Sequence, residues 1–264
     1  MGMTVEDIRE LLRAADESEF HALERSLAAD ERKGVRAALE VARKRIQAER
    51  AEATRLNGLY AYERSLVAEG LAGPIVGLDE VGRGPVAGPL AVGAVVFENG
   101  AEPLAGLNDS KQIAAERRAA IAEEVKRTAR AWAVCYVQPE EIDRDGMARS
   151  LRRAFDQALR QVLDEIGEQP ALVLVDGNPL HIHEREVNVV KGDARCASIA
   201  AASVIAKVDR DAMMVELAAR YPQYGFDANK GYASAEHVDA IRSHGLCPAH
   251  RASFCKSFLQ ETLF

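Results

Sequence analysis

The sequence predicts an α/β fold, with a mixed central sheet flanked by helices and a helical N-terminal extension before it. Three observations lead to this prediction. From Ile75 onward, strand-like and helix-like runs alternate, which is the order typical of α/β domains. The segment before them has no proline until Pro74 and is rich in residues that favour helices. The chain has 264 residues, of which 48% are hydrophobic, enough for one large packed domain with an appendage.

Residues 1–72 form the predicted extension, and residues 73–264 form the predicted main domain. In the extension, apolar residues such as Ile8 and Leu12 recur at helical spacing. Residues 32–55 contain eight Lys and Arg against three Glu, a local surplus of five positive charges. The extension is therefore either a solvated helical hairpin or a basic arm that contacts a phosphate backbone. Charged helix faces are more often simply solvated.

The main domain is predicted to contain five strands and four long helices. The strands are Ile75–Leu78, Leu90–Phe97, Ala131–Val137, Ala171–Val175 and Val187–Val190. The helices are Ala114–Arg130, Met147–Ile166, Ala194–Tyr221 and Ala235–His244. In the second helix, apolar residues recur every three or four positions from Leu151 to Leu163, so we expect this face to lie in the core.

The composition excludes some classes of protein. No run of about 18 uncharged apolar residues occurs, which excludes a membrane-spanning helix. The first ten residues do not resemble a secretory signal, so we expect a cytoplasmic location. The four cysteines have no regular spacing and are interpreted as free thiols, since a zinc site at Cys247, His250 and Cys255 would need a second tight pair of ligands. The net charge of −7 does not identify the partner, because clustered metal-binding carboxylates also lower it.

The most informative segment is PIVGLDEVGRGPVAGP, residues 74–89. An apolar strand is predicted to end on Asp79 and Glu80, and α/β sheets bind ligands where strands end. Adjacent side chains of a straight strand point to opposite faces, so both carboxylates can reach one metal only if the chain bends at Glu80. The alternative is an exposed acidic strand end before a tight turn. A nucleotide-binding loop is excluded, because GRGPVAG lacks the Lys-Ser/Thr of such loops and precedes a strand.

Two further acids lie in similar settings. Asp176 ends the strand-like run ALVLVD, and Asp193 follows before the long third helix. Asp193 could instead cap that helix, and Asp176 could form a turn with the glycine after it. Together with Asp79 and Glu80, these acids suit two divalent ions, Mg²⁺ or Mn²⁺, which prefer oxygen ligands and promote phosphodiester cleavage. No Ser-His-Asp or Cys-His arrangement with a supporting context competes with this interpretation.

Six motifs follow one another along residues 73–258. They are GLDEVGRGPVAGP, LNDSK, LVDGN, VVKGDARCASIAAASVIAKVDRD, NKGYAS and HRASF. In this order they closely resemble bacterial ribonuclease HII, a type 2 ribonuclease H, which implies a ribonuclease H-like fold. Residues 1–72 resemble, more weakly, the helical extension of some bacterial members. Asn229-Lys230 departs from the His-Lys common in the family, and Gln112-Ile113 departs after LNDSK, which leaves the fine substrate preference open.

The resemblance implies roles for the matching residues. The family's four catalytic acids correspond to Asp79, Glu80, Asp176 and Asp193, and the first three of these would be the metal ligands. The implied substrate-binding residues are Gly82, Arg83, Gly84, Ser203, Lys207 and Tyr232. The glycines of the GRG motif let main-chain groups approach the 2′-OH. Tyr232 would stack on the sugar after the ribonucleotide, although ordinary packing is the alternative. Ser203 and Lys207 would lie near substrate phosphates, or form a pair on the helix surface.

The resemblance also implies an activity. It predicts an endonuclease that cleaves the RNA strand of RNA–DNA hybrids and cuts 5′ to single ribonucleotides embedded in duplex DNA, leaving 3′-hydroxyl and 5′-phosphate ends. Such a monomeric enzyme would serve ribonucleotide excision in DNA replication and repair. A junction resolvase on the same fold would need the acids but not the sugar-reading residues. A non-catalytic nucleic-acid-binding protein is expected to lack one of the acids, and all four are present.

The C-terminal tail predicts a protein partner. Its last five residues, Gln260–Phe264, resemble the Gln-x-x-Leu-Phe peptide with which bacterial proteins bind the replication sliding clamp. Gln260, Leu263 and Phe264 would be the contacts, because a terminal segment with two apolar anchors is free to dock in a groove. The alternative is that these apolar side chains fold back onto the domain.

Overall fold

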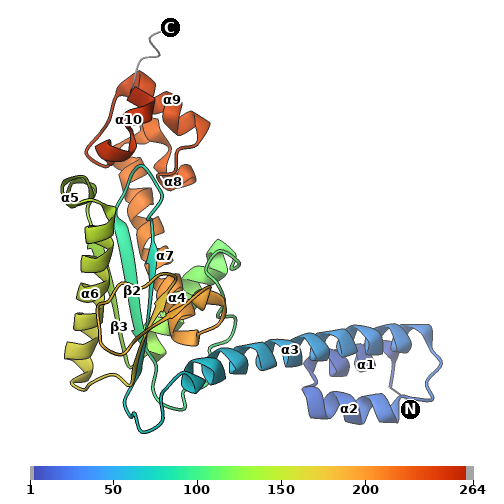
Figure 1. The fold of residues 1–264 in the computed structure, drawn as a ribbon. Coiled ribbons are helices and arrows are strands. Elements are labelled where there is room, and N and C mark those ends of the chain that lie inside the picture. The colour runs from blue at the N-terminus through green and yellow to red at the C-terminus, as the bar shows by residue number, and fades with distance from the viewer. Residues whose placement is uncertain (1–2, 260–264) are drawn as a thin grey trace. The chain divides into compact units, whose positions relative to one another are not determined.

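The computed structural model describes residues 3–259. The chain divides into two compact units, Met1–Asn57 and Gly58–Phe264. Helix α3 (Lys33–Ser65) begins in the first unit and ends in the second, so the chain passes between them within a helix (Figure 1). The division of roles at residue 72, between an extension and a catalytic domain, stays a prediction.

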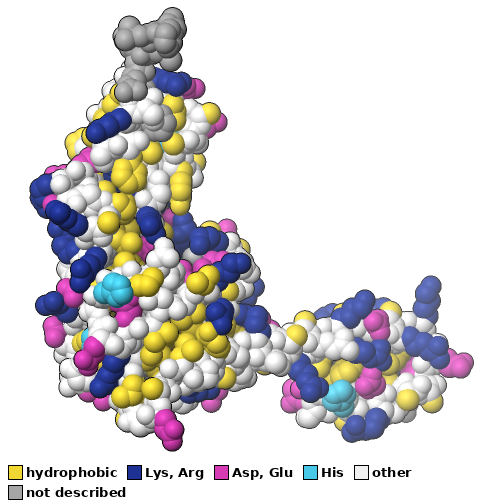
Figure 2. Space-filling model, in the orientation of Figure 1, with side chains coloured by type: hydrophobic (Ala, Val, Ile, Leu, Met, Phe, Trp, Pro, Cys, Tyr) yellow, Lys and Arg dark blue, Asp and Glu magenta, His cyan; other side chains and the backbone are white. Residues whose placement is uncertain are grey.

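The first unit is helical. Helices α1 (Val5–Ala14) and α2 (Glu17–Ser26) each begin at a capping box, in which the side chains of Thr4 and Asp16 accept hydrogen bonds from backbone N–H groups of the first turn. With the start of α3 these helices enclose an apolar cluster of Ile8, Leu12, Ala15, Phe20, Leu27, Val35, Leu39, Ala42 and Ile46. Basic and acidic side chains are interspersed over the visible surface of this unit (Figure 2). The predicted N-terminal helices are confirmed.

The second unit contains a five-stranded sheet with the strand order β3-β2-β1-β4-β5. Its strands are β1 (Ile75–Val81), β2 (Leu90–Val96), β3 (Ala131–Val137), β4 (Leu172–Asp176) and β5 (Glu186–Val189). Strand β2 pairs antiparallel with β1 and β3, whereas β4 pairs parallel with β1 and β5. The predicted mixed sheet is therefore confirmed.

Strand β1 differs from the prediction at its end. Its ladder with β4 stops at the pair Leu78–Val175, but its ladder with β2 continues through Val81. The prediction that the strand ends on Asp79 and Glu80 is thus wrong on the side that faces β2. The chain returns from β1 to β2 through the loop of residues 82–89, and the antiparallel pairing with β2 keeps β1 extended through both acids.

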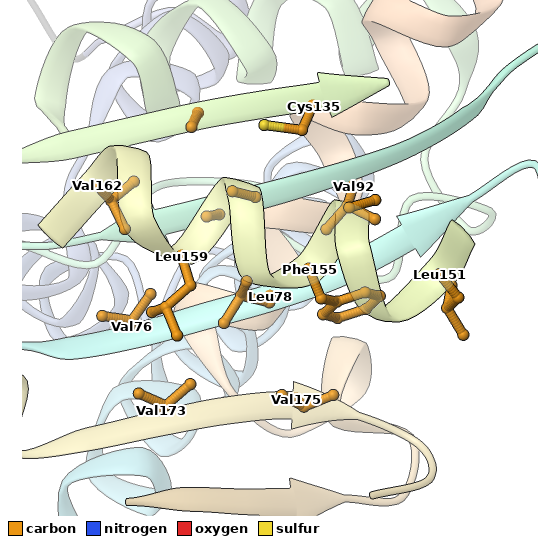
Figure 3. Packing of buried hydrophobic residues seen from close by; sticks show 14 of the residues in the cluster. Val76, Leu78, Val92, Cys135, Leu151, Phe155, Leu159, Val162, Val173 and Val175 are labelled. Atoms are coloured by element: carbon orange, nitrogen blue, oxygen red, sulfur yellow. The ribbon is translucent and has the colours of Figure 1, made fainter. Parts of the chain in front are cut away.

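Helices cover both faces of the sheet. On one face, α6 (Met147–Ile166) packs its apolar stripe into the main core, where Phe155 and Leu159 lie over Val76 and Leu78 (Figure 3). This confirms that the stripe lies in the core. On the other face lies α7 (Ala197–Arg220) (Figure 1), whose first half is buried along its length.

Two glycines let α7 lie directly against the sheet. A Cβ atom on Gly77 of β1 would come within 2.3 Å of the backbone of Ser198. A Cβ atom on Gly93 of β2 would come within 2.3 Å of the carbonyl oxygen of Ala202. No side chain fits between these backbones, so the glycines set the distance between α7 and the strand that carries Asp79.

The other helices are α4 (Ala115–Thr128), which packs against α7, and several helices of ten residues or fewer. The short ones are α5 (Pro139–Asp145), α8 (Phe226–Asn229), α9 (Ala235–His244), α10 (Lys256–Leu259) and the 3₁₀ turns η1 (Gly192–Ala194), η2 (Pro222–Tyr224) and η3 (Ala252–Phe254). The prediction missed α5, α8 and α10, which are too short to show a helical period. Within residues 3–259, none of the helices is both long and apolar enough to cross a bilayer. The predicted clamp contacts Gln260, Leu263 and Phe264 lie outside the described residues.

Candidate active site

Carboxylates from three distant segments meet at one end of the sheet. Asp79 on β1 and Asp176, the last residue of β4, directly follow the last backbone pair between these parallel strands, so they lie side by side where that pairing stops. Asp193 lies in η1, and the backbone N–H of Gly192 beside it donates a hydrogen bond to Asp176 Oδ1 at 2.6 Å. The structure thus brings together acids that are far apart in the sequence.

The charge of Asp79 is held in an unfavourable environment. Only 6% of the residue is exposed, and its Oδ1 accepts a hydrogen bond from the backbone N–H of Glu80 at 2.8 Å. Burial raises the pKa of Asp79 well above its ordinary value, and the negative charges of Glu80, Asp176 and Asp193 raise it further. A hydrogen bond with Ser203 lowers this pKa in part. The acids are therefore close enough to repel one another.

The other acids share this environment. Burial raises the pKa of Glu80, the Arg83 guanidinium 3.5 Å away lowers it, and the charge of Asp176 raises it again. Burial also raises the pKa of Asp193, which the ammonium group of Lys111, 3.9 Å away, partly offsets. The two basic side chains compensate little of the negative charge, because both are more than half exposed to solvent.

The donor set fits a hard divalent cation. The side chains that meet here offer carboxylate oxygens, the ligands that Mg²⁺ and Mn²⁺ prefer. Across residues 3–259, no three Asp, Glu, His or Cys side chains already surround a single point as metal ligands do. The acids are thus neighbours, but their side chains do not converge on one ion position. A bound cation would relieve the repulsion between their carboxylates. The same finding gives no support to a zinc site at Cys247, His250 and Cys255.

The GRG loop between β1 and β2 is held from inside by Arg251. This arginine is fully buried, and its guanidinium donates hydrogen bonds to the carbonyl oxygens of Gly82 at 2.6 Å, Pro85 at 2.8 Å and Gly88 at 2.8 Å. Burial lowers the pKa of Arg251 to about 9. A buried guanidinium that satisfies several carbonyl groups at once fixes the path of the loop.

A second buried arginine supports the same loop from α7. Arg210 donates to the carbonyl oxygens of Pro89 at 2.9 Å and Lys230 at 3.1 Å. Gly82 has φ +89°, and a Cβ atom there would lie 2.2 Å from Arg210 Nε, so only glycine fits at this position. Sequence reasoning missed both arginines, although Arg251 lies within the HRASF motif. Their partners are backbone carbonyls, most of them 121 or more residues away, and a carbonyl group is supplied by any residue type, so the sequence does not reveal these contacts.

Tyr232 lies beside the GRG loop. A Cβ atom on Gly84 would lie 3.8 Å from Cε1 of Tyr232, and the tyrosine is 54% exposed. The residue before it, Gly231, accepts hydrogen bonds at its carbonyl oxygen from the backbone N–H groups of Val86 and Ala87. Backbone hydrogen bonds therefore join the segment that carries Tyr232 to the segment just after the GRG motif, and Tyr232 beside them is accessible to solvent.

Ser203 and Lys207 lie on α7 in different environments. Ser203 is only 1% exposed; its hydroxyl lies 3.0 Å from the Ser110 hydroxyl and hydrogen bonds with Asp79. The alternative of a surface pair is therefore wrong for Ser203. Lys207 forms an ion pair of 2.7 Å with Asp211. A phosphate contact by either residue stays a prediction.

Most of the chain matches one family. The family model of Ribonuclease HII matches residues 76–257, and that of the Ribonuclease HII N-terminal domain matches residues 4–67. A curated relative named Ribonuclease HII, from Halalkalibacterium halodurans, is 38% identical over 96% of this chain and 94% of the relative. Another of the same name, from Pelotomaculum thermopropionicum, is 40% identical with the same coverage of 96% and 94%.

The fold also agrees with that of a solved structure. The ribonuclease HII in a complex with PCNA from Archaeoglobus fulgidus aligns with a TM-score of 0.59 and 27% identity, over 72% of this chain and 98% of that chain. This likeness confirms the predicted ribonuclease H-like fold. The chain belongs to the ribonuclease HII family, whose members are hydrolases that cleave the RNA strand of RNA–DNA hybrids.

Proposed function

We propose that this member of the ribonuclease HII family cuts on the 5′ side of single ribonucleotides in duplex DNA, leaving 3′-hydroxyl and 5′-phosphate ends, in addition to cleaving RNA–DNA hybrids. One observation carries the proposal. The acids Asp79 and Asp176 lie side by side where the parallel pairing of β1 with β4 stops, and β1 leads from Asp79 into the GRG loop, with Tyr232 against that loop. A group that reads the sugar and a group that cuts the backbone would need to be neighbours in this way.

The proposed metal ligands are Asp79, Glu80 and Asp176, with Asp193 as the fourth catalytic acid. Two divalent ions, Mg²⁺ or Mn²⁺, would supply when bound a nucleophile at neutral pH and stabilisation of the leaving oxygen. The chain's own part is to hold these acids in place. The Ser203 hydrogen bond orients Asp79, and the Gly192 N–H orients Asp176.

The proposed selectivity resides in the GRG loop and Tyr232. Because Arg251 and Arg210 fix the carbonyl groups of the loop, its main chain is a rigid surface against which a 2′-OH can be recognised. The exposed ring of Tyr232 is free to stack on the next sugar. Arg83, whose side chain is 56% exposed, is available to the substrate strand.

The test is a comparison of three substrates in Mg²⁺ or Mn²⁺. They are a duplex with one ribonucleotide, the same duplex in DNA only, and a four-way junction. Cleavage solely at the 5′ side of the ribonucleotide is the expected result, and equal cleavage of the junction would overturn the proposal. Asp79→Asn should abolish cleavage, whereas the matched control Asp156→Asn, at a partly exposed acid paired with Arg160 on α6, should not.

We further propose a partner and a setting. The tail Gln260–Phe264 would bind the replication sliding clamp through Gln260, Leu263 and Phe264, and the monomeric enzyme would act in the cytoplasm in replication and repair. A relative from Archaeoglobus fulgidus forms a complex with PCNA, which supports a clamp as partner. Deletion of Gln260–Phe264 should abolish clamp binding and spare activity on short duplexes. Unchanged affinity for the clamp would refute this part of the proposal.

A further inference from the structure

His237 and His250 form a buried pair. Their Nε2 atoms lie 3.0 Å apart, and the two residues are 0% and 5% exposed. At one end of the pair, His237 Nδ1 lies 2.7 Å from the carbonyl oxygen of Tyr232. At the other end, His250 Nδ1 lies 3.0 Å from the backbone nitrogen of Cys247. These contacts form a continuous chain from Cys247 to Tyr232.

One neutral arrangement of ring hydrogens satisfies the whole chain. A carbonyl oxygen can only accept, so Nδ1 of His237 carries a hydrogen and its Nε2 is an acceptor. The Cys247 N–H can only donate, and it lies 3.0 Å from His250 Nδ1, whereas the Cys247 carbonyl oxygen is farther from that nitrogen, at 3.3 Å. Nδ1 of His250 therefore accepts from the Cys247 N–H, and its Nε2 carries the hydrogen. His250 therefore donates to His237, which donates to Tyr232.

The surroundings keep both rings neutral. The rings of Tyr224 and Phe226 pack against the pair, with 4.7 Å between the centroids of Tyr224 and His250. Besides Tyr224, the titratable group that faces the pair is the Cys247 thiol, whose Sγ lies 3.2 Å from His250 Nδ1; the hydrogen bonds described for either ring include no carboxylate. Burial, and next the charge of His237, lowers the pKa of His250 to about 4, and burial lowers the pKa of His237.

The pair connects the two sugar-reading elements. Because the Tyr232 ring is 54% exposed, its position depends on its backbone. The Tyr232 carbonyl accepts hydrogen bonds from the Ser234 N–H at 2.9 Å and from His237. His250 directly precedes Arg251, the residue that holds the GRG loop. The chain of contacts thus joins the backbone of Tyr232 to the segment that fixes the loop.

We propose that His237 and His250 are positioning residues, a directional relay of hydrogen bonds that sets Tyr232 at the distance from the GRG loop required to read a ribonucleotide followed by a deoxyribonucleotide. This inference rests on the proposed function of Tyr232 and the loop. The relay is intact only while both rings are neutral, because a second hydrogen would place two N–H groups against each other across 3.0 Å. Removing the relay should therefore lower kcat/KM for a duplex with one ribonucleotide more than kcat/KM for a continuous RNA–DNA hybrid.

The first test is independent of activity. Nitrogen-15 NMR of the full chain at pH 7 distinguishes the two neutral histidine tautomers. We expect the Nδ1–H form for His237 and the Nε2–H form for His250, assigned by the loss of signals in single variants. Two rings of the same tautomer, or a charged ring at pH 7, would overturn the relay whether or not the proposed function holds.

The second test compares two substrates cut by one enzyme. We expect His237→Phe to lower kcat/KM about tenfold for a duplex with one ribonucleotide and to leave a continuous RNA–DNA hybrid of the same sequence within about twofold. His250→Leu should do the same. The amide of His250→Gln can replace the Nε2–H donor, so this variant should restore the ratio of kcat/KM for the two substrates to within about threefold of the wild-type ratio. His244→Phe is the matched control, since His244 lies on α9 and contacts Tyr224 but not the pair.

The outcomes separate this inference from the proposed function. If the wild-type enzyme does not cut at the single ribonucleotide, the proposed function fails, while the tautomers still test the relay. If it does cut there, and folded His237→Phe keeps the wild-type ratio of kcat/KM for the two substrates, the positioning role is refuted. If His237→Phe does not fold, the same comparison is made between His250→Gln and His250→Leu. Equal ratios of kcat/KM for the two substrates in these two variants would also refute the positioning role.

Discussion

At the scale of single residues, the buried acids of the active site destabilise the folded protein. Asp79 is buried among other acids, and its pKa is raised chiefly by burial, so its ionised form at neutral pH destabilises the folded state. Burying a carboxylate next to like charges is unfavourable unless a cation or a set of donors compensates it. The site is thus strained electrostatically in a way that a bound cation would relieve.

This strain gives a prediction for Asp79→Asn. In metal-free buffer, we expect this substitution to raise the melting temperature by about 2–4 °C, the shift that about 1 kcal/mol produces in a domain of this size. In wild-type protein, adding Mn²⁺ should raise the melting temperature by linkage, and the variant should lose most of this response. Calorimetry with and without EDTA measures both effects. A variant that is destabilised, or that responds fully to Mn²⁺, would contradict the assignment of Asp79 as a ligand.

The buried histidines predict a pH dependence of stability. His237 and His250 have folded-state pKa values below the ordinary 6.5, with His250 at about 4, so the unfolded chain binds protons more readily as the pH falls. Their contribution to stability is complete above about pH 6.5 and is lost as the pH falls from 6.5 toward 4. Urea unfolding between pH 7 and 4.5 should show a steeper fall for wild-type protein than for the variant with both histidines replaced by Phe. Parallel curves would mean that folding does not change the pKa of either ring.

The sequence indicated the acids but not the residues that hold the loop. Asp79 and Asp176 could be found because each follows a run of apolar strand residues, and ligands bind near the carboxyl ends of such strands. Arg251 and Arg210 could not be found, because their partners are backbone carbonyls that any residue type supplies. Nor could the contact between His237 and His250 be read from the sequence, since it depends on how α9 and the segment after it turn toward each other.

At the scale of elements, α7 organises the site. It carries Ser203 toward Asp79 and Arg210 toward the GRG loop. Its N-terminus is held by Glu63 of α3, whose Oε2 accepts hydrogen bonds from the backbone N–H and the hydroxyl of Ser198 at 2.9 and 2.8 Å. A carboxylate at a helix N-terminus stabilises the helix. Here the carboxylate comes from a residue 135 positions away in the sequence, so the residues next to α7 gave no sign of it.

The spacing between α7 and the sheet can be tested with Gly93→Ala. The added methyl group would lie 2.3 Å from the carbonyl oxygen of Ala202, so α7 must shift or the strand must bend. We expect a loss of stability of about 1–3 kcal/mol and a loss of activity from the displaced Ser203. Denaturant unfolding and the cleavage assay measure the two effects.

Gly58→Ala is the matched control for that experiment. A Cβ atom on Gly58, within α3, meets no atom within 4 Å. Alanine should therefore stabilise the helix by about 0.5–1 kcal/mol and leave cleavage unchanged. If Gly93→Ala behaved like this control, contact between α7 and the sheet would not position the site.

At the scale of the whole molecule, the sequence predicted the kinds of element better than their pairing. The alternation of strands and helices after Ile75 predicted a mixed sheet, which is confirmed. The strand order was not predictable, because β4 joins β1 across about 90 residues and nothing local selects that partner. The parallel pairing of β1 with β4 is nevertheless what places Asp79 beside Asp176.

The charges of the first unit lead to the last prediction. The surplus in residues 32–55 is offset by the acids before it, since residues 1–57 contain eleven Lys and Arg against twelve Asp and Glu, a net charge of −1. Several of these arginines are also paired within the unit, among them Arg43 with Glu24 at 2.7 Å and Arg45 with Glu49 at 2.9 Å. Both observations favour a solvated helical unit over a basic arm on DNA.

We therefore expect the first unit to add little to the salt dependence of substrate binding. Each phosphate contact contributes about 0.9 to the slope of log K against log salt concentration on duplex DNA. With cleavage blocked by Asp79→Asn, replacing Lys33 and Lys44 by Ala should change the slope by less than about 0.5, whereas replacing Arg83 beside the site should lower it by about one. Titrations of a labelled duplex between about 50 and 200 mM salt give these slopes. If the slope for the lysine variant fell by nearly two instead, the first unit would be a phosphate-binding arm. The ion pairs within the unit would then not prevent it from binding phosphates.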